Sequence, residues 1–541
     1  MRIISRLSVL VLALFVMACQ DMDVTNPNNP SRDSAIESPQ DVETLIATSF
    51  LQWFNRSNQT TPSIGLSAMA NEFNSGFGCF GALEYGSEPR GPVTVDPTAG
   101  SQPHRLAWSD YYSVIAGNNT ALQAIEQFGL QIMRGGNDET QRARAFAKFT
   151  QGLSHGYIGL MFDRGYVYSE SVDPESLGFV GEDQSVQELV RPYPEVMDTA
   201  IAQLEEAKNI AETHNVTIPS TSTERWISGY ELGTQDFVRL INTYIARLMV
   251  YQARSPEERQ AVDWQTVIDY IDQGITSDFA PVGEPDVMTS WYKHRAARLR
   301  SVIPSDFMRP SYMLIGHADQ GDGFINWYNS DWQNREPFTM ENVPDRRIVD
   351  EEGEEGKYMG HYVANIFAAE RGTAHRSYYY YHRFGSGNTF NTGPLPVVTV
   401  DEMNLLKAEG LIRMNRADEA VPLINQTRVA NGELPPVTID GVPEDASGFC
   451  APRKFNGACG SLWDALRWEK RIEGAGVEGT VSFYDARGWG ALVVNTPIHF
   501  PVPAQDQDLL GFGRYSMGGG GEGSAPPPNP EQCPVSLPRC P

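Results

Sequence analysis

The sequence predicts a mainly α-helical protein, in which tetratricopeptide-like helix pairs form a curved scaffold and a loop-rich, irregular region covers one side. Two observations lead to this prediction. Apolar residues recur at helical spacing before residue 278 and after residue 396, but the pattern is lost between those positions. In addition, residues 405–424 (LLKAEGLIRMNRADEAVPLI) have small or apolar residues where a repeat of about 34 residues places its interhelical contacts.

Helix starts follow from the residues that precede each periodic segment. Ser38-Pro39 stands ahead of Asp41 and Glu43, a combination that is typical of a helix N-terminus. The expected helices cover residues 40–54, 108–128, 138–162, 193–211, 235–254, 264–275, 400–414, 417–430 and 462–473.

The N-terminus has the features of a secretion signal. Arg2 and Arg6 mark a basic start, and residues 7–17 form an apolar run well short of the roughly 20 residues that a membrane-spanning helix needs. The run ends in Val-Met-Ala-Cys, which resembles the lipobox of bacterial lipoproteins and implies cleavage before Cys19 and lipidation of Cys19. The alternative is an ordinary signal peptide with a chance cysteine. Residues 1–18 are the expected lipoprotein signal peptide, and the polar residues 19–34 are the expected linker.

Composition limits the classes of partner. The chain has 541 residues, of which 41% are hydrophobic and 20% charged, enough for a large folded core. Its net charge of −26 repels nucleic-acid phosphates, so nucleic acid is excluded as a partner. No segment after the signal peptide is apolar enough to cross a bilayer, so we expect a lipid-tethered chain rather than an embedded one.

Five further cysteines follow the lipobox. Export to an oxidising compartment favours disulfides. The economical local pairs are Cys450–Cys459 and Cys533–Cys540, which leave Cys79 unpaired. The sequence alone does not fix this connectivity, so the two pairs are expectations.

Aromatic residues mixed with polar ones mark the candidate ligand-binding loops. Sugar rings present apolar C–H faces that stack on aromatic side chains, and their hydroxyl groups need polar partners nearby. Such mixtures occur in residues 278–396 and 72–85. The aromatic and amide side chains singled out in these segments are Phe77, Tyr85, Trp291, Tyr292, Asn326, Trp327, Tyr328 and Trp332. For each of them the alternative is packing beneath a loop.

Two patterns suggest chemistry, and each has a simpler explanation. Residues 152–156 (GLSHG) fit the G-x-S-x-G nucleophile elbow of a serine hydrolase, with Ser154 as the nucleophile. That motif works only at a strand-to-helix turn, whereas residues 143–151 have helical periodicity. No metal-ligand spacing is matched by the nearby histidines His361, His375 and His382. We therefore expect no catalytic residue, no metal and no other cofactor.

A charged cluster follows the last predicted helix pair. Its members are Glu469, Arg471, Glu473, Asp485 and Arg487, and arginine forks pair well with carboxylates. Two interpretations are open: a ligand site, or a structural ion-pair network that locks the last helix to the following loop. The second is favoured.

Several segments carry a resemblance to a known family by their order and spacing. They are the lipobox with VTNPNNP (24–30), YYSVIAGNNTALQAIE (111–126), ARAFAKFTQGLSHGYIGLMFDRG (143–165), the stretch 400–432, LRWEKRIEGAGVEGTVSFYDARGWG (466–490) and PIHFPVPAQDQDLL (497–510). Together they resemble the SusD/RagB family of outer-membrane nutrient-binding lipoproteins. The sequence departs from the family pattern in a longer glycine-rich step at 474–479 and in the order Asp163-Arg164-Gly165, so the identity of the ligand does not carry over.

The resemblance implies a SusD-like fold for the mature chain. We expect four parts: an N-terminal helical region (35–277), a loop-rich insertion on the ligand side (278–396), a C-terminal helical region (397–511) and a flexible Gly/Pro-rich tail (512–541).

The resemblance also implies a function. The expected protein is lipid-anchored to the outer membrane on its extracellular side, binds a nutrient and delivers it to a TonB-dependent, SusC-like transporter. An oligosaccharide is the expected ligand and a peptide the alternative, and binding uses shape, stacking and hydrogen bonds without a chemical step. In SusD-like proteins the ligand-stacking aromatics come from comparable loop regions, so the resemblance implies that the eight residues singled out in residues 72–85 and 278–396 are the candidate ligand-binding residues. Two other functions stay open: a serine hydrolase that uses Ser154, and a structural surface lipoprotein that binds no ligand.

The lipid anchor is testable by one substitution. Cys19→Ser removes the sulfur that would carry the lipid, so we expect the variant to leave the membrane fraction of a bacterial host, whereas the wild-type chain stays there. The measurement is an immunoblot of membrane and soluble fractions. A Cys19→Ser chain that still fractionates with the envelope would contradict the anchor.

Overall fold

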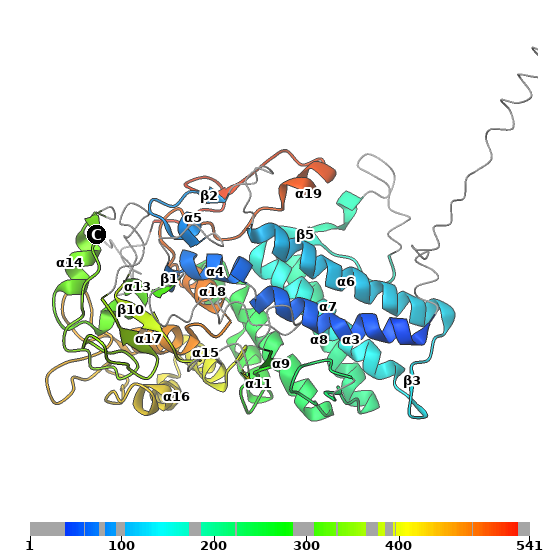
Figure 1. Cartoon of the computed structure of the whole chain (residues 1–541), viewed down its shortest axis with the longest axis horizontal. Coiled ribbons are helices and arrows are strands. Elements are labelled where there is room, and N and C mark those ends of the chain that lie inside the picture. The colour runs from blue at the N-terminus through cyan, green and yellow to red at the C-terminus, as the bar shows by residue number, and fades with distance from the viewer. Residues whose placement is uncertain are drawn as a thin grey trace, which may run out of the picture.

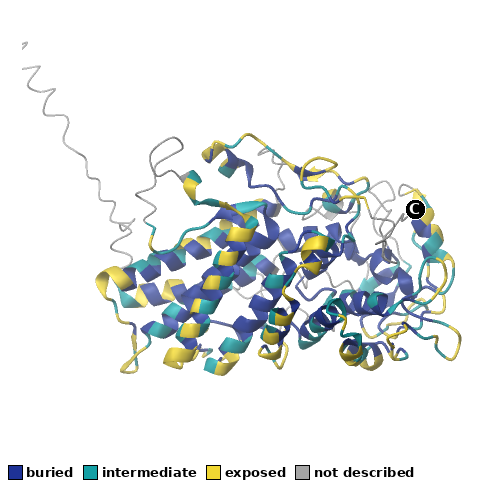
Figure 2. Cartoon of the chain, turned by 180° about the vertical axis from the view of Figure 1, so that it is seen from behind, coloured by how far each residue is buried: buried dark blue, intermediate teal, exposed yellow. Residues whose placement is uncertain are grey.

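The computed structural model describes residues 38–58, 60–74, 82–93, 103–172, 186–221, 224–284, 308–331, 334–363, 377–384, 393–394, 396–478 and 480–527. Within them the prediction of a mainly α-helical protein is confirmed. Long helices lie side by side in one half of the molecule, and shorter helices and loops make up the other half (Figure 1). Figure 2 shows that the buried residues lie between the helices and the exposed ones on their outer faces.

All nine predicted helices are present, with ends that differ by a few residues. They are α3 (Pro39–Asn58), α6 (Pro103–Phe128), α7 (Thr140–Met161), α8 (Tyr193–His214), α9 (Thr234–Tyr251), α11 (Trp264–Asp272), α15 (Val400–Arg413), α16 (Ala417–Ala430) and α17 (Leu462–Gly474). Neighbouring helices pack in pairs, as in α7 with α8 and α15 with α16. Their apolar faces meet there, which is what the helical spacing of apolar residues predicts.

Further short elements were not predicted. The helical ones are α4 (Thr60–Met69), α5 (Ala82–Gly86), α10 (Pro256–Gln260), α13 (Tyr312–Ile315), α14 (Gly323–Asn329), α18 (Val481–Gly488), α19 (Ala504–Leu509) and the 3₁₀ turns η2 (Val186–Leu189) and η3 (Gly316–Ala318). Most are too short to show a helical period in the sequence.

The strands are short and pair in antiparallel twos. The pairs are β1 (Phe73–Asn74) with β8 (Arg309–Pro310), β2 (Pro92–Val93) with β12 (Met517–Gly518), β3 (Met133–Arg134) with β4 (Asn137–Asp138), β5 (Arg164–Tyr166) with β6 (Val190–Pro192), β7 (Val282–Gly283) with β11 (Gly393–Pro394), and β9 (Met359–His361) with β10 (Tyr379–Tyr381). Each pair joins loops rather than building a sheet core.

The two ends of the predicted insertion meet in space. The amide of Phe279 donates to the carbonyl of Val398 at 2.9 Å, and the amide of Val397 donates to the carbonyl of Phe279 at 2.8 Å. The pairing of β7 with β11 extends this contact. The chain therefore leaves the helical scaffold and returns to it at one place, as an inserted region must.

The first part of the predicted flexible tail belongs to the folded body. β12 pairs with β2, and the amide of Ala525 donates to the carbonyl of Thr496 at 2.7 Å. The glycines of this stretch, at positions 518, 519, 520 and 523, have positive φ angles. They form turns that other residues adopt only with strain, so here glycine indicates a defined path rather than flexibility. Residues 528–541 lie outside the described residues.

Helix α7 is buried on nearly all sides, and three glycines make this possible. A Cβ atom on Gly152 would lie 2.7 Å from Cγ of Leu204, and one on Gly156 would lie 2.6 Å from Cδ1 of Leu248. On Gly159 it would lie 2.5 Å from Sδ of Met197. These distances are below van der Waals contact, so α8 and α9 approach α7 through the missing side chains.

The same observation decides against the G-x-S-x-G interpretation. Ser154 lies in the middle of α7 and is fully buried. A nucleophile elbow needs an exposed serine at a strand-to-helix turn. In this chain the motif is a helix-packing pattern, and the hydrolase alternative is wrong in its geometry.

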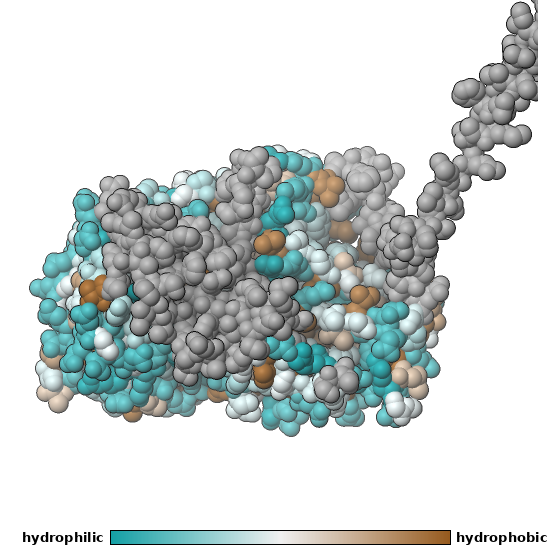
Figure 3. Space-filling view, viewed as in Figure 1, coloured by the Kyte–Doolittle hydropathy of each residue, from teal (hydrophilic) through white to brown (hydrophobic). Residues whose placement is uncertain are grey.

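The surface of the described residues is largely polar. Among the described helices, none combines the length and the apolar character needed to span a bilayer. The described surface in Figure 3 is largely hydrophilic, with apolar residues scattered over it. Scattered apolar residues are ordinary for a surface in water.

The packing of α7 can be tested with one alanine. In Gly152→Ala the new Cβ meets Leu204 and also lies 2.9 Å from the carbonyl oxygen of Ala200, so we expect a loss of about 1–3 kcal/mol of unfolding free energy. The measurement is urea unfolding followed by circular dichroism.

A matched control is available for this test. Gly117 lies on α6, and nothing is found within 4 Å of a Cβ placed there. Gly117→Ala should be neutral or stabilising by up to about 1 kcal/mol, because alanine restricts the unfolded chain. Equal destabilisation by both substitutions would refute close packing at Gly152.

Candidate functional site

An aromatic cluster lies in the half of the molecule that is built from shorter helices and loops. The rings of Tyr312 and Phe338 stack at 4.2 Å between centroids, and the Tyr312 ring meets the Trp327 ring edge-on at 5.3 Å. These residues belong to a second hydrophobic core, separate from the core around α7. This second core holds α13, η3 and α14 in place.

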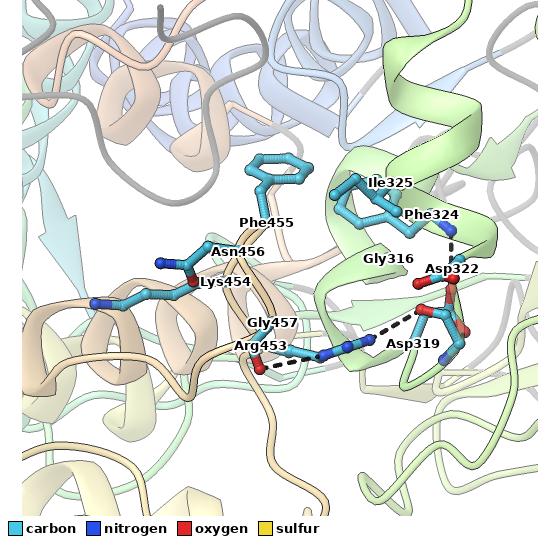
Figure 4. Close-up of a pocket in the computed structure, with 11 residues that line it drawn as sticks. Gly316, Asp319, Asp322, Phe324, Ile325, Arg453, Lys454, Phe455, Asn456 and Gly457 are labelled. Atoms are coloured by element: carbon cyan, nitrogen blue, oxygen red, sulfur yellow. Dashed lines mark hydrogen bonds between the residues drawn. The ribbon is translucent and has the colours of Figure 1, made fainter.

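A pocket of about 210 Å³ opens beside α14. One wall is the segment from η3 to α14, and the other is the loop between Cys450 and Cys459. Figure 4 shows Phe455 on the loop side, and Phe324 and Ile325 across from it on α14. The side chains that line the pocket are Asp319, Asp322, Phe324, Ile325, Arg453, Lys454, Phe455 and Asn456.

Asp319 shapes the wall formed by α14. Its carboxylate accepts hydrogen bonds from the amides of Phe324 and Glu341, both at 2.8 Å, and from the amide of Gly321 at 3.2 Å. The bond from Phe324 satisfies an amide in the first turn of α14 that would otherwise lack a partner, and the bond from Glu341 ties a later segment to this turn. A glycine is required at 316, because a Cβ there would lie 2.2 Å from the Phe324 ring.

The opposite wall is the disulfide-closed loop. The sulfur atoms of Cys450 and Cys459 are bonded, so the structure contains the first of the two pairs that the spacing favours. The Arg453 guanidinium donates to the carbonyls of Gln320 at 2.8 Å and Gly321 at 2.9 Å. This arginine therefore fastens the loop to the turn before α14.

Phe455 fastens the tip of the loop. Its ring centroid lies 4.6 Å from that of Tyr328 and 5.4 Å from that of Phe324, the latter in a stacked arrangement. The His317 ring lies 5.2 Å away. Burial lowers the pKa of His317 to about 4, so the imidazole is neutral at pH 7 and the ring cluster carries no charge there.

The chemistry of the pocket suits a ligand with both apolar and polar faces. Phe324, Ile325 and Phe455 supply apolar surface, while Asp322 and Asn456 are exposed polar groups at its edge. The ammonium group of Lys454 lies 3.9 Å from the carboxylate of Asp464, which is a long contact for an ion pair. Among the described residues no group of histidine, cysteine and acidic side chains could hold a metal ion.

The structure separates the predicted ligand-binding residues into four groups, of which Tyr85 alone forms the last. Asn326 is exposed on α14, one position from the pocket residue Ile325. Trp327 and Tyr328 are buried behind the pocket, where the Arg335 guanidinium lies 4.6 Å from the Trp327 ring. Outside the described residues lie Phe77, Trp291, Tyr292 and Trp332, and also Cys19, Cys79, Cys533 and Cys540.

Tyr85 lies on α5, away from α14. Its ring is half-buried and packs 6.0 Å from the Phe500 ring. Its carbonyl oxygen accepts a hydrogen bond from the buried Arg90 guanidinium. Tyr85 thus packs beneath the neighbouring segment in this structure and does not line the pocket.

The sequence reasoning missed every side chain that lines the pocket, including its two aromatic residues, Phe324 and Phe455. Phe324 lies three residues before Trp327, so helical spacing places both on one face of α14, and this could have identified it. Phe455 stands between two cysteines, and a ring inside a disulfide loop is a weaker signal. The partnership of the two depends on contacts between segments about 130 residues apart, such as that of Gln320 with Cys450.

The charged cluster is a structural network. Arg347 is fully buried and donates to Asp345, Glu469 and Glu473, with distances of 2.6–2.9 Å. Burial alone would raise the pKa of Asp345, but the Arg347 charge and hydrogen bonds hold it below its usual value. Burial outweighs the same arginine at Glu469, whose pKa is raised.

The other members of the cluster are equally enclosed. Asp485 accepts hydrogen bonds from Arg259 at 2.7 Å and Lys470 at 2.8 Å. Arg471 donates to the carbonyl of Met313, and Arg487 donates to those of Leu160, Tyr251 and Ile498. The favoured interpretation is therefore supported, but the network joins several helices rather than one helix to its following loop.

Of the histidines His361, His375 and His382, the structure gives a side-chain partner to His361. The Nε2 atom of His361 lies 3.2 Å from Oγ1 of Thr339, and burial lowers its pKa. His382 follows β10, and His375 lies outside the described residues.

Comparison with known proteins identifies the fold. No protein-family model matches the sequence, and no curated protein matches it either. Among solved structures, a SusD superfamily protein from Parabacteroides distasonis aligns with 89% of this chain and 98% of its own, at a TM-score of 0.52 and 14% identity. A SusD homolog from the same organism covers 82% of this chain and 84% of its own (TM-score 0.52, 13% identity). A SusD-like protein from Bacteroides fragilis covers 84% and 87% (TM-score 0.51, 13% identity).

The buried network predicts a large stability effect. Arg347→Met leaves Asp345 and Glu469 buried without their cation, so we expect a loss of about 3–5 kcal/mol of unfolding free energy. Urea unfolding measures it. The control is Arg416→Met, which breaks the exposed pair of Arg416 with Glu419 and should leave the unfolding midpoint unchanged, because exposed pairs contribute little. Equal effects of the two substitutions would mean that the network does not hold the helices.

Proposed function

We propose, from the SusD-superfamily fold that this chain shares, that the protein is a cell-surface lipoprotein that binds an oligosaccharide and delivers it to a TonB-dependent, SusC-like transporter. The observation that carries the proposal is the breadth of the structural likeness, which extends over 89% of this chain and 98% of a SusD superfamily protein. The lipobox-like Val-Met-Ala-Cys19 supports the surface location. A fold alone does not define a ligand, so the site has to supply the rest of the argument.

The pocket beside α14 supports carbohydrate as the ligand class. Its Phe324 and Phe455 rings and Ile325 offer apolar surface to the C–H face of a sugar ring, while Asp322 and Asn456 lie where hydroxyl groups could be bound. A volume of about 210 Å³ is below the roughly 300 Å³ at which small-molecule sites usually begin. The pocket would therefore take one unit of an oligomer and leave the rest of the chain outside.

The proposed mechanism is binding without a chemical step. A preformed wall and a fastened loop hold the rings in place before ligand arrives, which lowers the entropy lost on binding. Because no covalent bond forms, the ligand can pass to a transporter whose surface competes with the pocket for it. In this proposal the loop-rich insertion, residues 278–396, forms the ligand side, and the helical scaffold carries it.

The two other functions make different predictions. A serine hydrolase would lose activity in Ser154→Ala, but Ser154 is buried within α7, where no substrate reaches it. A structural surface lipoprotein would show no saturable ligand. Both are separated from the proposal by a binding experiment.

The binding experiment uses the full chain with Cys19→Ser, to keep it free of lipid. Calorimetric titration with maltoheptaose, cellohexaose, a xyloglucan heptasaccharide and tri-alanine should give saturable binding of an oligosaccharide and none of the peptide. Phe455→Ala should then lower the affinity about two- to tenfold, because one aromatic contact contributes about 0.5–1.5 kcal/mol. Failure of every oligosaccharide to bind would overturn the proposal.

The control for that substitution is Phe128→Ala. Phe128 is 51% exposed at the end of α6, which lies across the molecule from α14 (Figure 1). Its removal should leave the affinity unchanged. The transporter half of the proposal is tested separately, by affinity purification of the lipidated chain from outer membranes, where a β-barrel should co-purify.

A further inference from the structure

We infer that the Cys450–Cys459 disulfide sets ligand affinity by holding the tip of its loop, and with it Phe455, at the mouth of the pocket. This inference rests on the proposed function, because it concerns the same site. It adds a positioning element: the disulfide touches no ligand and acts through the ring that does. Three observations carry it.

The first observation is that the two arms of the loop are held unequally. The leading arm, residues 450–453, is fastened to the rest of the protein. Gln320 donates to the carbonyl of Cys450 at 2.9 Å, and the amide of Arg453 donates to the carbonyl of His317 at 2.8 Å. The Arg453 guanidinium adds two bonds to the carbonyls of Gln320 and Gly321.

The returning arm has far fewer outside contacts. The carbonyl of Ala458 accepts from the amide of Lys454 at 2.7 Å, and the amide of Gly460 donates to the carbonyl of Pro452 at 2.9 Å, both within the loop region itself. The carbonyl of Gly460 also accepts from the amide of Val442. Between these points the disulfide at Cys459 is the strongest restraint on the path of the chain.

The second observation is exposure. Residues 456–458 form an exposed tip, and the preceding residue, Phe455, is half-buried. Its ring seats the tip against Phe324, Tyr328 and His317. An exposed, glycine-containing tip gains conformational freedom once its ends are released.

The third observation is the composition of the pocket wall. Phe455, Asn456 and Lys454 all come from the span that the disulfide closes. Of the three, Phe455 lies across from the α14 residues Phe324 and Ile325, as Figure 4 shows. Opening the disulfide therefore loosens the part of this wall beyond Arg453, while the other wall stays fixed by Asp319. A ligand would have to order that wall on binding, and its affinity would fall by that cost.

The experiment compares two forms of the full chain, both with Cys19→Ser. One has the disulfide, and the other carries Cys450→Ser and Cys459→Ser. Amide hydrogen exchange read by mass spectrometry follows residues 450–460, with α7 as the internal reference. We expect exchange at Lys454 and Gly460 to rise at least about tenfold in the serine form and α7 to stay unchanged. Unchanged exchange in the loop would overturn the inference.

The binding arm titrates both forms with maltoheptaose, cellohexaose and the xyloglucan heptasaccharide. An affinity at least about tenfold lower in the serine form supports the inference, and equal affinity despite faster exchange overturns it. No binding by the disulfide-containing form overturns the proposed function instead, and the exchange result still shows whether the disulfide positions the loop.

A second variant covers the case in which the serine form does not fold. Phe455→Ala keeps the disulfide and removes the ring that seats the tip. Exchange at Lys454 should then rise only slightly, because the disulfide still restrains the returning arm. A rise as large as that expected for the serine form would place the positioning role in Phe455 and overturn the role of the disulfide.

Discussion

Buried arginines paired with carboxylates join the parts of the chain on either side of the insertion. Arg247 of α9 donates to Glu402 of α15 at 2.8 Å and to Glu478 at 2.6 Å. Arg259 of α10 donates to Glu409 of α15 and to Asp485 of α18. Removing such charges from water costs several kcal/mol per ion, and the cost is offset only when each partner is in place. The helices before residue 278 and after residue 396 are therefore held in one fixed arrangement.

The same constraint reaches the pocket through α17. Glu469 and Glu473 of this helix hold Arg347, and Arg471 donates to the carbonyl of Met313 at 2.7 Å. Met313 belongs to α13, which leads through η3 into the pocket wall of α14. A loop-built site is thus positioned by a helix of the scaffold. This is how a region with little regular structure can present a preformed surface.

The sequence predicted the helices whose apolar residues recur at helical spacing, and it missed most of the short elements. Helix α7 was predicted although it is buried on nearly all sides, because its large apolar residues still follow the helical period. Helix α4, with the apolar and small residues of Thr60–Met69, is buried at nearly every described position and has no polar face to set a period. Trp327 and Tyr328 were identified as aromatic residues of the right region, but composition does not say which way a ring on α14 points.

The pocket and the scaffold depend on different residues, and this separation bears on how the fold could serve different ligands. None of Ile325, Phe455 and Asn456 takes part in the buried ion pairs. Substitutions at these half-buried or exposed positions change the lining of the pocket without leaving a buried charge unpaired. Arg347 and Glu469 have no such freedom. A chain of this kind can keep its fold at 13–14% identity to its structural neighbours while the residues that line its pocket change, because the interactions that fix the helices lie away from the pocket.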